Sequence, residues 1–190
     1  MEFIRTEIPE VVLCKPTIFK DERGYFYEVF KKESFEKFVG YSVDFCQDNE
    51  AKSSKGVLRG LHYQLPPFAQ SKLVRVIKGK VLDVVVDIRK GSKTFGKSVV
   101  VELSEENKYQ LFVPQGFAHG YVTLSEEAIF CYKVDNYYNK ESERGIIFND
   151  ETLNIDWKFT VEDLIISEKD KLQPTLKNAD LFEPNFKLNA

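Results

Sequence analysis

The sequence contains little of what metal, redox and disulfide-bonded proteins depend on. Two histidines and three cysteines stand among its 190 residues. The cysteines are odd in number and lack the spacing of metal ligands or of a redox pair, so no disulfide framework is indicated. We expect Cys14, Cys46 and Cys131 to be reduced, mostly buried and chemically idle.

Long apolar runs and an excess of positive charge are also missing. No stretch of apolar residues is long enough to cross a bilayer, and the charges within residues 1–10 leave no apolar core for a signal peptide. With a formal net charge of −3, the chain lacks the basic footprint of a general nucleic-acid binder. We expect a cytoplasmic protein without membrane or nucleic-acid partners, in which a few local cations suffice for a small anionic ligand.

What the sequence does have is the composition of an all-β core. Aromatic residues make up 14% of the chain, and they lie in short β-branched runs divided by Gly, Asn, Asp and Ser. This spacing is typical of a sandwich or barrel and leaves little room for helix. The length predicts a single domain over residues 1–190. Short helical or turn segments are expected at residues 33–39 and 167–170, with an extended strap from Gln173 onward.

Both histidines follow an apolar run that is punctuated by glycine. His62 stands in G-V-L-R-G-L-H-Y-Q at residues 56–64, and His119 stands in P-Q-G-F-A-H-G at residues 114–120. Such a strand can deliver an imidazole into a cavity, where an unperturbed pKa of about 6.5 allows proton transfer near neutral pH. Two similarly placed histidines indicate one site. The alternative is that each is a buried, hydrogen-bonded core histidine.

The strand around His62 sets a geometric condition on such a site. Side chains alternate along a regular strand, so His62 shares a face with Gly60 while Arg59 lies on the other face. If Arg59 and His62 serve one site, Gly60 must therefore mark a bulge or twist that re-aims them.

Two apolar runs, residues 72–77 and 80–88, predict a hairpin with its turn at Gly79. The second run carries two acids. Exposure of one whole strand face to solvent would explain Asp87. Asp83 is flanked by valines, which favours a buried partner such as a histidine or a cation.

Residues 128–134 alternate so that the Tyr132 hydroxyl lies on an otherwise apolar face. A core tyrosine that reaches a backbone carbonyl is the alternative to a functional one.

Several motifs stand in a fixed order between residues 17 and 170. They are R-G-L-H-Y-Q, K-L-V-R-V with G-K-V-L-D-V-V-V-D-I-R, P-Q-G-F-A-H-G, Y-K-V-D-N-Y-Y and S-E-K-D. Together they resemble the motifs of the dTDP-4-dehydrorhamnose 3,5-epimerase family, whose members are deoxysugar-nucleotide enzymes. The resemblance implies a cupin-type jelly-roll β-sandwich with short peripheral helices, assembled as a homodimer, and this agrees with the all-β pattern.

The resemblance also implies a substrate and a reaction. The substrate would be a dTDP-4-keto-6-deoxy sugar, dTDP-4-dehydro-6-deoxy-glucose, whose C3 and C5 are inverted to give dTDP-4-dehydro-L-rhamnose. Hydrogens beside a ketone are acidified, so a base can remove one if the resulting enolate is stabilised, and no redox cofactor is expected. Inversion then requires a base on one face of the ring and a proton donor on the other.

Catalytic roles follow from the residues that match the family's motifs. By this resemblance His62 is the base, and Asp170 orients and charges its imidazole. Tyr132 is the general acid, and Lys72 holds the C4 oxygen as negative charge develops. Taken alone, Lys72 would be assigned as a solvated surface charge.

Substrate-binding residues are carried over in the same way. Arg59 and His119 resemble contacts to the pyrophosphate, with Asp83 as the partner of His119. Further nucleotide contacts are implied for Gln47, Asn49 and Tyr138. A last group resembles the residues that hold the thymidine end from the neighbouring subunit, namely Phe19, Arg23 and Glu28. We therefore expect a nucleotide site that is shared between the subunits of a homodimer.

The wider cupin family often binds metal, and here the sequence departs from its pattern. Gln64 replaces the next expected histidine, and Phe68 stands near the place of a carboxylate ligand. Because a catalytic metal normally has about three protein ligands, His62 and His119 would need an acid such as Asp83 to complete a site. We expect no metal.

Two other functions stay open. A relative of the same fold inverts a single carbon or acts as a ketoisomerase on a similar sugar nucleotide, and the set of His62, Tyr132 and Lys72 does not exclude the single-carbon epimerase. The other is a non-catalytic cupin that binds a sugar nucleotide as a sensor or lectin-like module. The complete set of base, acid and oxyanion-binding residues favours an enzyme.

Overall fold

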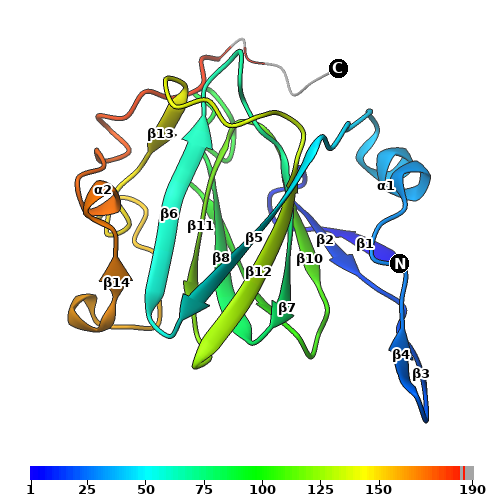
Figure 1. Cartoon of the computed structure of the whole chain (residues 1–190). Coiled ribbons are helices and arrows are strands. Elements are labelled where there is room, and N and C mark those ends of the chain that lie inside the picture. The colour runs from blue at the N-terminus through cyan, green and yellow to red at the C-terminus, as the bar shows by residue number, and fades with distance from the viewer. Residues whose placement is uncertain (185, 187–190) are drawn as a thin grey trace.

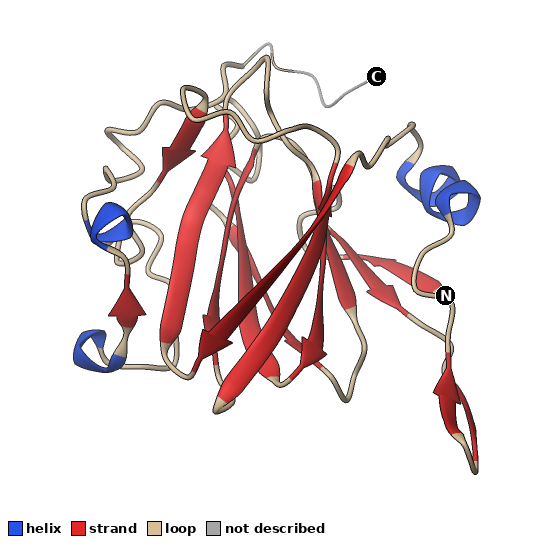
Figure 2. Ribbon diagram, in the orientation of Figure 1, coloured by secondary structure: helices blue, strands red, loops and turns tan. Residues whose placement is uncertain are grey.

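Two β-sheets packed face to face make up most of the computed structural model, which describes residues 1–184 and 186 (Figure 1, Figure 2). The first sheet contains, in spatial order, β1 (Glu2–Arg5), β2 (Val12–Lys15), β10 (Gln110–Val113), β7 (Lys72–Lys78), β12 (Glu127–Val134) and β5 (Gln47–Ser54). The second contains β13 (Glu143–Gly145), β6 (Val57–Gln64), β11 (Phe117–Thr123), β8 (Lys80–Asp87) and β9 (Ser98–Ser104), with β14 (Ile165–Ile166) beside β6.

The space between the sheets is filled by β-branched and aromatic side chains from both. Val74 of β7 and Val85 of β8 are fully buried there, together with Phe130 of β12 and Phe117 of β11. Burying one such side chain contributes roughly 1.5–3 kcal/mol, so this layer supplies much of the free energy that holds the sheets together. The prediction of an all-β sandwich is confirmed.

The outer face of the second sheet is covered by the C-terminal third of the chain. Trp157, Leu176 and Phe182 pack on the apolar side chains that β6, β11 and β8 direct outward. The expected strap from Gln173 runs irregularly over this face, with one parallel bridge between Phe182 and Arg89. Its end, residues 185 and 187–190, lies outside the described residues. Both faces of β8 are therefore buried.

The predicted hairpin between β7 and β8 is wrong. The two strands follow each other in sequence but lie in different sheets, because β7 pairs with β10 and β12 while β8 pairs with β9 and β11. Gly79 turns the chain from one layer to the other with a φ of 76°, and a Cβ there would lie 2.1 Å from the Glu127 carbonyl oxygen. The glycine allows this corner between layers.

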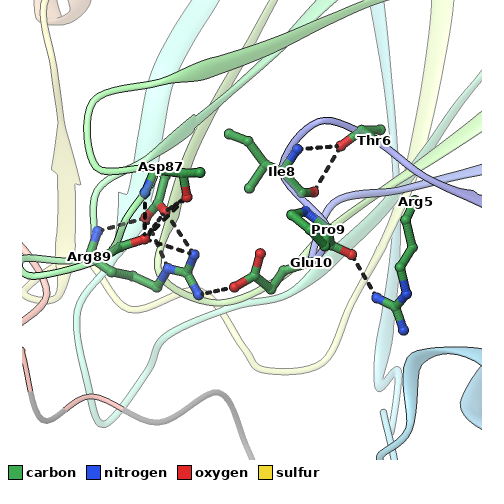
Figure 3. Close-up of polar contacts among 9 residues, drawn as sticks. Arg5, Thr6, Ile8, Pro9, Glu10, Asp87 and Arg89 are labelled. Carbon is green, nitrogen blue, oxygen red and sulfur yellow. Dashed lines mark hydrogen bonds and ion pairs between the residues drawn. The ribbon is translucent and has the colours of Figure 1, made fainter.

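The expectation that Asp87 is exposed is also wrong. Strand alternation puts Asp87 on the face of Val81 and Val85, and this face packs against the first sheet. Its carboxylate is fully buried and accepts hydrogen bonds from Arg89 Nε at 2.9 Å and from the Ser92 and Thr94 hydroxyls at 2.6 Å. Arg89 Nη1 also donates to Glu10 at 2.9 Å (Figure 3). Burial raises the pKa of Asp87, but these hydrogen bonds outweigh burial and lower it overall.

Short elements lie around the sandwich. The predicted helix at residues 33–39 is confirmed as α1 (Lys32–Val39), which buries Phe35 and ends at Gly40. The turn at residues 167–170 contains α2 (Glu168–Lys171), which follows the 3-10 turn η1 (Val161–Asp163). The hairpin of β3 (Phe19–Asp21) and β4 (Gly24–Phe26) projects away from the sheets (Figure 1). No helix among the described residues combines the length and apolarity that crossing a membrane requires.

The cysteines are free thiols, as expected. Cys14 and Cys131 are buried and Cys46 is exposed. Burial raises the pKa of Cys14 to about 12, so its thiolate is scarce at neutral pH.

We predict that Asp87→Asn destabilises the fold by about 3–5 kcal/mol, because it leaves the charge of Arg89 buried without its main partner. Since the folded pKa of Asp87 is lowered, its stabilisation is present above the unfolded pKa and is lost as pH falls through the folded value. Wild type and variant should therefore converge in acid. Urea unfolding between pH 3 and pH 7 measures both effects.

The control for this prediction is Asp156→Asn, which removes the same charge from an exposed pair with Lys158. Equal destabilisation by both substitutions would contradict the role given to the buried network.

Candidate active site

A cavity of about 580 Å³ opens between the sheets, on the side where β5 and β6 lie. It receives side chains from both sheets and from the segment of β14 and α2. A second cavity of about 280 Å³ adjoins it, and His62, Lys72 and Tyr132 line both. Three other predicted site residues, Arg59, His119 and Asp170, line the first cavity, and so does Tyr121.

The two histidines face each other on paired strands. His119 of β11 lies directly opposite His62 of β6, and the register between these strands shifts between His119 and Tyr121. Gly60 stands at this shift with a φ of 133°, and a Cβ on it would lie 2.5 Å from the Gly120 Cα. The shift changes which residues of β6 face inward, so Arg59 and His62 both line the cavity. The predicted irregularity at Gly60 is confirmed.

His62 is held by a carboxylate. Its Nε2 lies 2.5 Å from Asp170 Oδ1, and the Asp170 side chain is 5% exposed. Burial raises the pKa of Asp170, but hydrogen bonds from His62, Ser167 and the Gly60 peptide N–H lower it overall. An ionised carboxylate can only accept, so the imidazole donates from Nε2 and leaves Nδ1 with a free lone pair. This is the arrangement of a base that is ready to take a proton.

His119 forms a second pair of the same kind. Its Nε2 lies 2.9 Å from Asp83 Oδ2, and the two side chains are 7% and 0% exposed. The expected buried partner of Asp83 is therefore His119.

Lys72 and Tyr132 enter the cavity from neighbouring strands of the opposite sheet. Burial lowers the pKa of Lys72 to about 8, although Asp83 and Glu143 oppose that shift. Burial raises the pKa of Tyr132, which keeps its hydroxyl protonated at neutral pH. One side of the cavity thus offers a proton donor and a readily titrated amine, and the other side offers the base.

Arg59 gives the cavity a fixed positive charge. Its Nε donates to Ser53 Oγ at 3.1 Å, and Ser53 also lies 3.4 Å from the Tyr121 hydroxyl. The Tyr121 ring stacks on Phe130 with centroids 4.1 Å apart. A guanidinium anchored in this way suits a phosphate group.

The adjoining cavity contains the other predicted nucleotide contacts, Gln47, Asn49 and Tyr138. Gln47 Nε2 donates to Asn49 Oδ1 at 2.7 Å, and the Tyr138 hydroxyl donates to Glu143 at 2.8 Å. Glu143 also pairs with Lys169 at 2.5 Å.

Four cavity residues were missed by the sequence reasoning. Ser167 and Lys169 stand in the S-E-K-D motif beside Asp170, so the motif could have indicated them. Tyr121 follows P-Q-G-F-A-H-G directly and shares its inward face with His119. Glu143 lies in a polar stretch without periodicity, which carries no signal.

The structure does not bring Phe19, Arg23 and Glu28 to this cavity. Phe19 is 62% exposed on the projecting β3–β4 hairpin, where the Arg23 guanidinium pairs with Asp21 at 2.5 Å. Glu28 is exposed just after β4. Their expected contact with a nucleotide of another subunit stays a prediction.

Gln64 has a structural use that a histidine could not fulfil. Its Nε2 donates to the Phe68 and Tyr137 carbonyls, and its Oε1 accepts the Asn139 N–H at 2.7 Å. Over residues 1–184 and 186, no three His, Cys, Asp or Glu side chains are grouped as metal ligands. A metal-free reaction stays a prediction.

Comparison with known proteins decides the family. The family model described as dTDP-4-dehydrorhamnose 3,5-epimerase matches residues 5–178. The chain belongs to this family. A Shigella flexneri protein named dTDP-4-dehydrorhamnose 3,5-epimerase is 54% identical over 96% of this chain and 99% of its own length. The cupin-type β-sandwich expected from the resemblance is confirmed by solved structures of the family.

Two of these structures are especially similar. The dTDP-4-dehydrorhamnose 3,5-epimerase of Elizabethkingia anophelis is 53% identical, with a TM-score of 0.91 over 94% of this chain and 97% of that one. The 3,5-epimerase of Legionella pneumophila, in complex with dTDP-4-keto-L-rhamnose, is 47% identical, with a TM-score of 0.91 over 96% of this chain and 97% of that one.

We predict that Lys72 titrates with a midpoint near pH 8, well below the value of about 10.4 for a solvated lysine. The midpoint is measured from the NMR signal of the Lys72 Cε in protein labelled with ¹³C-lysine. The signal is assigned by its absence from Lys72→Met. Because Asp83 raises the pKa of Lys72, Asp83→Asn should move the midpoint lower. A midpoint above pH 10 would show that the amine is solvated.

Proposed function

We propose that the protein is a cofactor-independent epimerase that inverts C3 and C5 of dTDP-4-dehydro-6-deoxy-glucose to give dTDP-4-dehydro-L-rhamnose. The observation that carries the proposal is one cavity that combines a carboxylate-held histidine, a half-buried tyrosine and a lysine of lowered pKa. The Legionella relative, whose structure is described with dTDP-4-keto-L-rhamnose, supports this substrate class.

His62 begins the reaction as the base. Its Nδ1 takes a proton from the carbon beside the ketone, and the electron pair of that C–H bond moves through the C4 carbon onto the oxygen. Asp170 stabilises the imidazolium that forms and keeps its ring in the required orientation. A carboxylate behind the imidazole supports a base of this kind.

Lys72 and Tyr132 complete the inversion from the other sheet. While protonated, below about pH 8, the Lys72 ammonium stabilises the negative charge on the C4 oxygen of the enolate. The Tyr132 hydroxyl then donates its proton to the same carbon from the opposite face, and the C4 oxygen returns to a ketone. His62 then releases its proton to solvent and Tyr132 takes one up, which returns both groups to their starting states.

The nucleotide end of the substrate would extend into the adjoining cavity. Arg59 and His119 would contact the pyrophosphate, and a contact to the base or sugar would come from Gln47, Asn49 and Tyr138. Phe19, Arg23 and Glu28 would reach this site from the other subunit of a homodimer. The exposed, projecting hairpin that carries Phe19 and Arg23 supports this sharing.

The proposal places the protein in the cytoplasm, because a nucleoside diphosphate sugar is too highly charged to cross a bilayer unaided. Inversion of a single carbon remains the alternative on the same residues, and the isotope experiment below separates the two.

We predict different defects for His62→Asn and Tyr132→Phe in deuterated water with the 4-keto-6-deoxy sugar nucleotide. His62→Asn cannot accept the proton, so no deuterium enters C3 or C5. Tyr132→Phe loses the donor of the opposite face, which slows inversion by roughly 10²–10⁴-fold. His62 can still remove a proton and return a solvent deuteron, so exchange survives at a larger fraction of the wild-type rate. NMR at C3 and C5 follows exchange and inversion separately.

Three outcomes would contradict parts of this proposal. Inversion at one carbon in the wild type identifies a single-carbon epimerase, and binding without any exchange identifies a non-catalytic module. Retention of exchange by His62→Asn shows that the base lies elsewhere.

We predict that subunits with Arg23→Ala regain activity when they are mixed with subunits carrying His62→Ala. Random exchange forms hybrids in half of the dimers, and each hybrid has one intact site, so about a quarter of wild-type activity is expected from this symmetry. Turnover after subunit exchange, verified by mass spectrometry, measures it.

The matched control mixes His62→Ala with Lys72→Ala, two substitutions within one subunit's cavity, where no hybrid holds an intact site. A nucleotide site shared through Arg23 would be excluded if both mixtures regained activity. It would also be excluded if neither mixture did.

A further inference from the structure

The carboxylate behind His62 is carried by a very short element. Asp170 lies on α2, which has four residues. A helix this short has almost no stability of its own, because the first hydrogen-bonded turn costs more conformational entropy than it returns. Its N–H groups also need partners outside the helix. Something other than helix propensity must hold Asp170 in place.

Ser167 supplies those partners. Its hydroxyl accepts the Asp170 N–H at 3.1 Å, and its carbonyl oxygen accepts the N–H groups of Asp170 and Lys171 at 3.0 and 3.1 Å. The nearby Ser167 hydroxyl is also one of the groups that lower the pKa of Asp170. One hydroxyl therefore holds the backbone of Asp170 and lies close to its carboxylate.

Apolar packing holds the chain that leads into α2 but not α2 itself. Leu164 and Ile166 pack against the core of the second sheet. Leu172, directly after α2, is 83% exposed, and Asp170 is the buried residue of α2. The segment is tied to the sandwich by the pairing of β14 with β6, including the bond from Ile165 N–H to the Gly56 carbonyl at 2.9 Å. Because α2 itself buries no apolar side chain, polar contacts set its orientation.

We propose that Ser167 is a positioning residue for the His62–Asp170 pair. Through its cap on α2 it places the Asp170 carboxylate within hydrogen-bond reach of His62 Nε2 and so fixes the tautomer that leaves Nδ1 free. The inference rests on the proposed function in one respect, that His62 is the base of the reaction.

The kinetic test replaces the hydroxyl and then restores it. Ser167→Ala should lower kcat about 10- to 100-fold, the cost of a misplaced catalytic group, while KM changes little because the nucleotide contacts are untouched. Ser167→Thr keeps a capping hydroxyl and should recover most of the loss. Ser167→Gly is the second variant, because glycine is tolerated at a helix N-cap and still lacks the hydroxyl.

The matched control is Thr160→Ala. It removes a hydroxyl on the same exposed segment, one that donates to Asp163 Oδ2 at 2.8 Å and does not touch α2. It should leave kcat as in the wild type. A loss of kcat in Thr160→Ala equal to that in Ser167→Ala would overturn the proposal, because general loosening of the segment would then suffice.

A spectroscopic test needs no substrate. The chain has two histidines, and each is paired with an aspartate. In long-range ¹H–¹⁵N spectra of the histidine rings, the wild-type His62 should show one dominant tautomer. In Ser167→Ala and Ser167→Gly its ring nitrogens should shift toward the average of an exposed imidazole, while those of His119 stay in place as the internal reference.

The two tests separate this inference from the proposed function. If the wild type neither exchanges nor inverts the substrate, the proposed function fails, yet the ring spectra still report whether Ser167 positions the pair. If the wild type is active and both hydroxyl-free variants keep its kcat and its His62 spectrum, the role of Ser167 is wrong and the function stands.

Discussion

The contact between Gly60 and Gly120 is the constraint on which the site depends. Strands β6 and β11 approach so closely there that a Cβ on Gly60 would lie 2.5 Å from the Gly120 backbone. The register shift at this point lets Arg59 and His62 face the same cavity, which strict alternation forbids. It also brings the Gly60 peptide N–H against the Asp170 carboxylate. One local irregularity therefore arranges Arg59, His62 and the carboxylate that pairs with His62.

A cavity between two sheets carries an electrostatic cost that the structure manages with paired charges. Asp83 is fully buried beside His119, and Asp170 is nearly so beside His62. Lys72 is different: burial lowers its pKa to about 8, and the charges of Asp83 and Glu143 offset this only in part. An amine in such a site interacts strongly with negative charge that appears beside it. The burial of these charged groups thus affects both the stability of the fold and the reactivity of the cavity.

Much of the fold could be predicted from the sequence because the strands alternate or are uniformly apolar, and both patterns are local. The wrong predictions concern what lies on the far side of a strand. Asp87 was expected to face solvent, but its face of β8 packs against the first sheet, and nothing near Asp87 in sequence reports this. The β7–β8 pair failed similarly, since Gly79 is compatible with a hairpin turn and with a corner between layers. The choice between a hairpin turn and a corner depends on which other strands pair with β7 and with β8.

The site residues were predicted unevenly for the same reason. Motifs fixed the positions of His62, Tyr132 and Asp170 in sequence, and the structure places all three at one cavity. Tyr121 lines the same cavity, and its alternation with His119 could have indicated it. Glu143 lines the adjoining cavity and is placed there by the pairing of β13 with β6, which no local pattern indicates. The residues of the β3–β4 hairpin differ again, because a contact with a second subunit has no trace in the contacts of one chain.

The two histidine–aspartate pairs show why residue type alone does not assign a role. Both join Nε2 of an imidazole to a buried carboxylate, at 2.5 Å for His62 and 2.9 Å for His119. The His119 side chain is 7% exposed, whereas that of His62 is 30% exposed and lines both cavities. A base must meet its substrate, so the greater exposure favours His62 over His119 for proton transfer. The difference follows from position: His62 lies on β6, next to α2, whereas His119 lies on β11, the middle strand of the second sheet. The histidine with access to both cavities thus lies toward the margin of the sheet, and the more deeply buried one lies at its centre.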